Sequence, residues 1–348
     1  TRPPGNPQEV EEVDRETPMN RDDAAQIILL GTAGGSITWA PGPAGAAARY
    51  GISTAIAIGG KIYVVDQGLG SARQLTLADP FSRGAGDVMT DLAAFFITHL
   101  HSDHVVDLGA FLHCGRNQGW PTTPVPVVGP GSRTLPELPV RTPGYQGGDV
   151  VPGTLALVDH LTEAFAADTA DRVIGSRKLR LRDLLDPIEV VTPEGDAVVV
   201  VFEDDRVRVS ATHVSHGSME PALAYRFDTE YGAVTLSGDT GPSENLIRLA
   251  RGSDLLVHEA ISHRYAEWLH GPGPYSEEER EELTYIFAKH TSSMAVGEIA
   301  NRAAVSTLVL SHLVPGNAPD SEWARASEGF DGEFVIGRDL MSIQLRRS

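Results

Sequence analysis

The chain has 348 residues, of which 41% are hydrophobic, and no run approaches the roughly 18 apolar residues of a membrane helix. Its 28 Lys and Arg residues stand against 47 Asp and Glu residues, which gives a formal net charge of −19. Because this charge repels polyanions on average, we expect a small-molecule substrate and not nucleic acid as a partner. The lack of a long apolar run predicts no membrane partner, and we leave a homodimer open. The single cysteine, Cys114, excludes an intrachain disulfide.

Residues 1–23 are polar and rich in proline, so we expect a flexible leader ahead of one domain over residues 24–348. The chain begins at Thr1 and not at a methionine. That is typical of a trimmed chain or of a mature exported protein, secreted or periplasmic, and a cytoplasmic location stays open as the alternative.

Short apolar runs that end in turn residues predict buried strands in the first third of the chain. One strand is expected within residues 24–35, and residues 53–68 predict two strands joined by a hairpin at Gly59 and Gly60. A strand over 93–98 leads directly into His99, and helical spacing follows over 104–115. The segment between them therefore lies at the carboxyl end of a strand, where side chains converge on a pocket.

The remainder of the chain predicts a second group of strands. Residues 114–196 differ in character and include an amphipathic helix candidate over 153–174; we interpret them as an inserted cap over the site, with an ordinary surface helix pair as the alternative. Strand-like alternation returns over 197–217 and 221–241, and helical spacing over 242–253 and 292–305 is each time followed by a short apolar strand. Two groups of strands with helices between them predict two packed sheets flanked by helices.

The six positions from His99 to His104 hold three imidazoles and the carboxylate of Asp103. Repulsion between protonated imidazoles, and the cost of desolvating the carboxylate, make this cluster unfavourable unless a cation binds there. Imidazole nitrogens and carboxylate oxygens are ligands of zinc and similar divalent ions, and four donors that face two directions can serve two ions. His99, His101, Asp103 and His104 are therefore candidate metal ligands.

Three later strand ends repeat the pattern of an apolar strand that ends in a possible ligand. The segment ATHVSHG contains His213 and His216, LSGDTG contains Asp239, and LSHLVP contains His312. Each residue alone is more typical of a cap or a turn. Together they predict the further ligands that a binuclear site needs.

The motifs HLHSDH, a later His, SGDT and LSH, in that order, resemble those of the metallo-β-lactamase superfamily of hydrolases over roughly residues 25–346. The resemblance implies an α+β fold with four layers, the αββα sandwich, and a site for two divalent ions, with zinc expected. It implies this ligand set: His99, His101 and His216 for one ion, Asp103, His104 and His312 for the other, and Asp239 between the two.

The choice of His216 over His213 depends on the segment PALAYRF that follows, since in similar proteins the ligand lies just before such a strand. Strand alternation places positions with odd separation on opposite faces, so the two histidines do not exchange roles easily. We expect His213 to support a ligand by a hydrogen bond or to belong to the core.

Two more segments resemble a particular branch of the superfamily. LVHEA, with Glu259, and KHTSS, with His290, are similar to the HEAT and HST motifs of ribonuclease Z. The resemblance implies that His290 is a proton donor supported by Glu259, and Asp103 completes the catalytic residues that we expect. A carboxylate raises the pKa of a neighbouring imidazole and fixes its tautomer, as a general acid requires. The alternative is that Glu259 and His290 only cap neighbouring elements.

The sequence also resembles type III arylsulfatases, and it contains nothing similar to the Gly-rich basic arm with which ribonuclease Z grips transfer RNA. We therefore expect a binuclear hydrolase of small-molecule esters (a sulfate ester, a phosphodiester or a lactone), in which two ions lower the pKa of a shared water. The alternative is an RNA-processing endonuclease like ribonuclease Z. An alternative of another class, a redox or binding protein on the same fold, agrees poorly with a full set of ligands.

Overall fold

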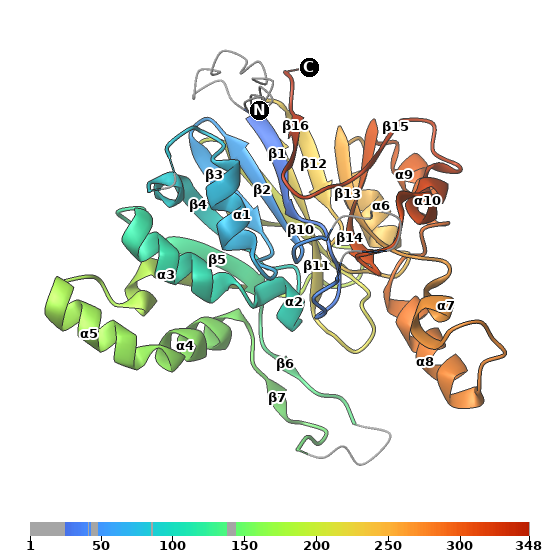
Figure 1. Ribbon diagram of the computed structural model, residues 1–348, viewed down its shortest axis with the longest axis horizontal. Coiled ribbons are helices and arrows are strands. Elements are labelled where there is room, and N and C mark those ends of the chain that lie inside the picture. The colour runs from blue at the N-terminus through green and yellow to red at the C-terminus, as the bar shows by residue number, and fades with distance from the viewer. Residues whose placement is uncertain (1–24, 41, 43–47, 85, 138–143, 348) are drawn as a thin grey trace, which may run out of the picture.

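The computed structural model describes residues 25–40, 42, 48–84, 86–137 and 144–347, so the expected leader over 1–23 lies outside the described residues. Two mixed sheets of seven strands face each other (Figure 1). Across the first sheet the order is β16 (Met341–Gln344), β1 (Ala25–Gly31), β2 (Ser53–Ile58), β3 (Lys61–Val65), β4 (Leu92–Phe96), β5 (Val125–Pro130) and β8 (Leu185–Val190). Across the second it is β15 (Glu333–Ile336), β14 (Thr307–Val314), β13 (Leu255–Ile261), β12 (Gly232–Leu236), β11 (Ala222–Thr229), β10 (Val207–Val214) and β9 (Val199–Glu203).

Helices cover the outer face of each sheet. The α-helices of the described residues are α1 (Ser71–Ala78), α2 (Ser102–Val105), α3 (Leu108–Gln118), α4 (Thr154–Ala164), α5 (Ala166–Ser176), α6 (Glu244–Ala250), α7 (Tyr265–His270), α8 (Glu277–Lys289), α9 (Val296–Ala303) and α10 (Asp320–Trp323). Helices α1, α3 and α4 pack on the first sheet, and α6, α9 and α10 pack on the second. The order of layers is helix, sheet, sheet, helix, which confirms the predicted αββα sandwich.

Both faces of the central strands are buried, and this explains why they are continuous apolar runs. In β2, Ile56 and Ile58 face the second sheet, whereas Ala55 faces the outer helices. Successive side chains of a strand point to opposite faces, so a strand that lies between two apolar layers has no solvent-facing positions. The hairpin between β2 and β3 is also confirmed, since Gly59 and Gly60 have φ angles of 53° and 81°, as a two-residue turn of this kind requires.

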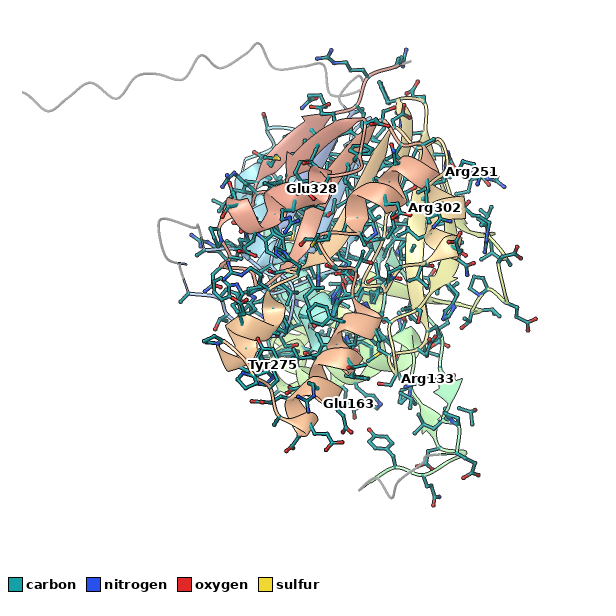
Figure 2. All side chains as sticks on the ribbon, turned by 90° about the vertical axis from the view of Figure 1, so that its right-hand side faces the viewer. Arg133, Glu163, Arg251, Tyr275, Arg302 and Glu328 are labelled. Carbon is teal, nitrogen blue, oxygen red and sulfur yellow. The ribbon has the colours of Figure 1, made fainter. Side chains whose placement is uncertain are left out.

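Residues 114–196 include strands of the first sheet as well as outer elements. β5 and β8 pair in parallel within that sheet, and the expected helix over 153–174 is divided into α4 and α5 at Phe165. Between β5 and α4, the short strands β6 (Arg133–Thr134) and β7 (Val150–Val151) form a hairpin that projects from the body (Figure 1). Figure 2 shows Arg133 on this projection, and its guanidinium donates to the carbonyl of Ser218 at 2.8 Å.

Among the described residues, no helix is both long enough and apolar enough to cross a membrane.

Candidate metal centre

The predicted ligands lie at strand ends of both sheets, which meet at one edge of the sandwich. The loop after β4 is fixed against the second sheet, because Tyr225 donates from its hydroxyl to the carbonyl of Ile97 at 2.9 Å and Leu223 donates from its N–H to the carbonyl of Thr98 at 2.9 Å. The first sheet supplies the residues from His99 to His104, and the second supplies residues after β10 and β12 and within β14. The structure brings all seven predicted metal ligands together.

A first cluster contains His99, His101, His216 and Asp239, whose candidate ligand atoms all lie within 4.8 Å of one another. Nδ1 of His101 lies 2.9 Å from Nε2 of His99 and 3.1 Å from Nε2 of His216. Oδ2 of Asp239 lies 3.8 Å from Nε2 of His99 and 3.7 Å from Nε2 of His216. Three nitrogens and one oxygen thus converge on one point.

A second cluster contains Asp103, His104 and His312, again with candidate ligand atoms within 4.8 Å of one another. Oδ2 of Asp103 lies 3.6 Å from Nε2 of His104 and 3.5 Å from Nε2 of His312. Asp239 reaches this cluster too, because its Oδ1 lies 3.4 Å from Nε2 of His104 and its Oδ2 lies 3.2 Å from Nε2 of His312. Asp239 therefore lies between the two clusters. That each residue binds an ion stays a prediction.

The polar atoms at the centre of the clusters suit a divalent cation. Nε2 of His104, Nε2 of His312 and Oδ1 of Asp239 are buried and find no hydrogen-bond partner among the described residues. Buried polar atoms are almost always satisfied, so the convergence of such atoms from three elements fits the binding of a cation. Imidazole and carboxylate groups are the donors that divalent metals of the zinc type use.

The protonation states of the clusters agree with this interpretation. Burial, with the neighbouring imidazoles, lowers the pKa of His99 well below its usual value and that of His101 to about 4, so both are neutral and able to bind a cation. Burial alone would raise the pKa of Asp239, but the imidazoles of His312 and His104 hold it well below its usual range. His104 differs, since surrounding carboxylates outweigh burial and raise its pKa well above the usual value. A divalent cation would replace that proton.

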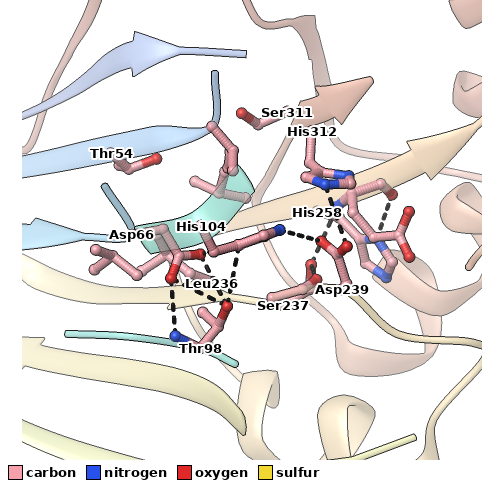
Figure 3. Close-up of a pocket in the computed structure, with 15 residues that line it drawn as sticks. Thr54, Asp66, Thr98, His104, Leu236, Ser237, Asp239, His258, Ser311 and His312 are labelled. Atoms are coloured by element: carbon pink, nitrogen blue, oxygen red, sulfur yellow. Dashed lines mark hydrogen bonds and ion pairs between the residues drawn. The ribbon is translucent and has the colours of Figure 1, made fainter. Parts of the chain in front are cut away.

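A second layer of polar groups orients the candidate ligands, and the sequence did not reveal it. His104 binds Oδ2 of Asp66 through Nδ1 at 2.8 Å, and Asp66 also accepts the N–H of Thr98 at 2.8 Å (Figure 3). His216 donates from Nδ1 to the carbonyl of Lys289 at 2.8 Å. Such bonds fix the tautomer and leave Nε2 of each ring free to bind a cation. Asp66 could have been found, because it follows the apolar strand IYVV in the same pattern as the predicted ligands.

The ring of His312 occupies space that a side chain at position 34 would fill. A Cβ atom on Gly34 would lie 2.4 Å from Nδ1 of His312. His312 itself has a φ of 44°, in the left-handed region that residues other than glycine rarely adopt. The absence of a side chain at Gly34 and the left-handed backbone at His312 therefore together position this imidazole.

The predicted acid pair lies beside the clusters. His290 follows α8, and its Nδ1 lies 3.1 Å from Oε1 of Glu259 in β13. The rings of His290 and His312 stack with centroids 5.8 Å apart. Burial would lower the pKa of His290, but the carboxylate of Glu259 outweighs burial and raises it. This imidazole can therefore carry a proton beside the two clusters of candidate metal ligands.

His213 lies apart from both clusters. Its side chain is 28% exposed and pairs through Nε2 with the carboxylate of Glu220. The expected support of a metal ligand is thus not among its contacts. An open cleft leads to the clusters and is lined by residues 35–37, Trp39, the metal-site side chains and the end of α8. No described residue from the stretch 114–196, the expected cap, lines this cleft.

No protein-family model matches the chain. The chain is 32% identical over 324 residues to a Ribonuclease Z of Mycolicibacterium gilvum, with 92% of this chain and 96% of that protein covered. A Ribonuclease Z of Mycobacterium bovis is 29% identical over 325 residues, with 92% and 98% covered.

Among solved structures, the metallo-beta-lactamase fold protein YhfI from Bacillus subtilis aligns with a TM-score of 0.57 at 17% identity, covering 92% of this chain and 100% of that one. The short form of human tRNase Z aligns with a TM-score of 0.58 at 16% identity, covering 92% and 99%. At these identities the two structures establish the fold alone. The similarity to the mycobacterial relatives extends over nearly the whole of both chains, so this chain belongs to the ribonuclease Z family of metallo-β-lactamase-fold proteins.

Proposed function

We propose that this chain is a metal-dependent endonuclease that hydrolyses phosphodiester bonds in RNA, with transfer RNA precursors as the substrates to test first. The observation that carries the proposal is the 32% identity, over 92% of this chain, to a protein named Ribonuclease Z. The paired residues Glu259 and His290, beside two clusters of candidate metal ligands, support the same chemistry.

The expectation of a small-molecule ester hydrolase was wrong, and so was the expectation that nucleic acid is not a partner. The relatives named Ribonuclease Z overturn both. The net charge was a misleading guide to the substrate because it sums over the whole chain, whereas a bound phosphate responds mainly to charges within roughly 10 Å of it.

The number and identity of the ions belong to the proposal. The first cluster would hold one ion and the second another, with Asp239 shared between them, and donor sets of imidazoles and carboxylates favour zinc. When bound, such ions supply a water that is deprotonated near neutral pH and offset the negative charge on the phosphoryl oxygens.

Residues of the chain would donate the proton to the leaving group and orient the metal ligands. Hydrolysis of the diester breaks the bond from phosphorus to the leaving ribose oxygen while the oxygen of a water becomes bonded to phosphorus, and His290 would donate a proton to the leaving oxygen. Nδ1 of His290 is held by Glu259, so Nε2 is the nitrogen that gives the proton. The N–H of Gly35 donates to Oδ2 of Asp103 at 3.0 Å and so orients this carboxylate as a metal ligand.

The test is cleavage of a precursor transfer RNA by the zinc-loaded protein, with p-nitrophenyl sulfate and bis-p-nitrophenyl phosphate as parallel substrates. We expect site-selective cleavage that a chelator abolishes and added zinc restores. Asp239→Ala, made and loaded in the same way, should be inactive on the RNA. If the loaded protein leaves the RNA intact but turns over a small ester, the proposal is rejected.

A further inference from the structure

Lys289 is the one Lys or Arg among the described residues that line the cleft beside the metal clusters. The chain contains three lysines, and the other two have partners: Lys61 pairs with Asp204 and Asp205, and Lys178 donates to a backbone carbonyl. No described carboxylate pairs with Lys289, whose ammonium lies 4.5 Å from the centre of the Tyr285 ring. Its charge is therefore available to an anion in the cleft.

The backbone of Lys289 is fixed relative to the metal site. Its carbonyl accepts the Nδ1 hydrogen of His216 at 2.8 Å. One residue earlier, the carbonyl oxygen of Ala288 lies so near Gly241 that a Cβ there would be 2.5 Å from it. Gly241 belongs to the loop that carries Asp239, so the end of α8 is packed directly on two candidate ligand segments.

The side chain of Lys289 is also held at the rim of the cleft. Gly217 has a φ of 65°, and a Cβ there would lie 3.3 Å from Cβ of Lys289, so this part of the side chain packs closely on the loop after His216. Tyr285, whose ring the ammonium contacts, is 47% exposed, and its hydroxyl lies 2.8 Å from Oγ of Ser218. The aromatic face attracts the ammonium and limits where it can move.

We infer that Lys289 binds a phosphate of the RNA strand adjacent to the phosphodiester that is cleaved, and that Tyr285 is a positioning residue that holds the ammonium there. The inference rests on the proposed function and names a contact within the same site. The metal clusters are placed to receive the reacting phosphate, whereas Lys289 lies beside them on the rim. Phosphate contacts from lysine and arginine fix the register of a nucleic-acid strand. A small diester has no neighbouring phosphate and cannot use this contact.

The experiment compares Lys289→Met with Lys178→Met, which removes the same charge away from the cleft, and with Lys289→Arg, which retains a cation. Each zinc-loaded variant is assayed on the precursor transfer RNA and on bis-p-nitrophenyl phosphate, with metal content as the measure of an intact site. We expect Lys289→Met to raise KM for the RNA about tenfold more than for the small diester, with kcat changed much less. The dependence of log(kcat/KM) on log salt should become shallower by roughly 0.7 to 0.9 for the RNA.

Lys178→Met should behave as the parent protein on both substrates, and Lys289→Arg should recover most of the affinity for RNA. Equal losses on the two substrates, or an unchanged KM and salt slope on RNA, would overturn the role of Lys289 while the ribonuclease activity of the parent protein stands. If the parent protein does not cleave RNA, the proposed function and this inference fail together. Tyr285→Ala should reproduce part of the KM effect at full zinc content, and no effect would remove Tyr285 from the positioning role.

Discussion

Oε1 of Glu259 lies 3.1 Å from Nδ1 of His290 and also accepts the backbone N–H groups of Thr240 at 3.0 Å and Thr291 at 3.1 Å. The Glu259 side chain is 1% exposed, and of this pair only His290 lines the cleft. Three donors on one oxygen fix the carboxylate, and the carboxylate in turn fixes the imidazole. His290 is therefore the member of the pair that can reach a substrate.

Replacing His290 with Ala should slow diesters with poor leaving groups much more than activated p-nitrophenyl diesters. A weakly basic phenolate departs without a proton, whereas an alkoxide does not, and general acid catalysis typically contributes about 10²- to 10⁴-fold. The measurement is kcat/KM for a series of aryl and alkyl diesters plotted against the pKa of the leaving group. An equal loss across the series would remove His290 from the acid role.

Glu259→Gln should shift the alkaline limb of the pH–rate profile to lower pH. The charge of Glu259 raises the pKa of His290, and a general acid must be protonated to act. Without that charge the imidazole loses its proton at lower pH, so activity falls earlier as pH rises, while the acidic limb stays in place. Profiles of kcat on a substrate with a poor leaving group test this, and an unmoved alkaline limb contradicts it.

Asp239→Ala should cost far more activity and bound metal than His213→Ala. Asp239 touches both clusters, so its loss disturbs both sites, whereas His213 pairs with Glu220 at the surface. Elemental analysis and chelator competition on both variants provide the measurement. The assignment of His216 over His213 is reversed if His213→Ala loses metal while His216→Ala retains it.

Gly34→Ala should weaken the second cluster and spare the first. The new methyl group would lie 2.4 Å from the His312 ring, which is a ligand candidate of the second cluster and not of the first. We expect the zinc content to fall from two ions per chain toward one, measured by elemental analysis after dialysis. Gly175→Ala is the matched control, since a Cβ there meets nothing within 4 Å. A Gly34→Ala protein with two tightly bound ions would show that the ring has room to move.

Much of the architecture followed from the order of apolar runs and turns. β4 and the ligand loop after it were predictable because an apolar strand such as AAFFIT, followed at once by polar donors, has few alternatives. The division of residues 153–174 into two helices was not predictable, because α4 and α5 share one amphipathic pattern and the break at Phe165 contains no Gly or Pro. Periodicity reports which side chains face a core, but not where the helix axis turns.

The candidate site was also only partly predictable, because the sequence does not show which distant residues come into contact. His99 to His104 could be found because their donors are adjacent in sequence, but Gly34 and Lys289 act through contacts with residues more than seventy positions away. Nothing near Gly34 in the sequence indicates that an imidazole from β14 will lie against it. The substrate class was predicted wrongly because the net charge does not show where in the fold an unpaired lysine lies.

The two clusters draw their donors from opposite halves of the sandwich, His99 to His104 from the first sheet and His216, Asp239 and His312 from the second. Bound ions would therefore cross-link the two sheets at this edge. A ligand that binds only the folded form stabilises it by about 2.7 kcal/mol when its free concentration is 100 times its dissociation constant. The supply of metal would then determine how strongly the two halves are held together, so the stability of the fold, as well as the proposed catalysis, would respond to the metal in the surroundings.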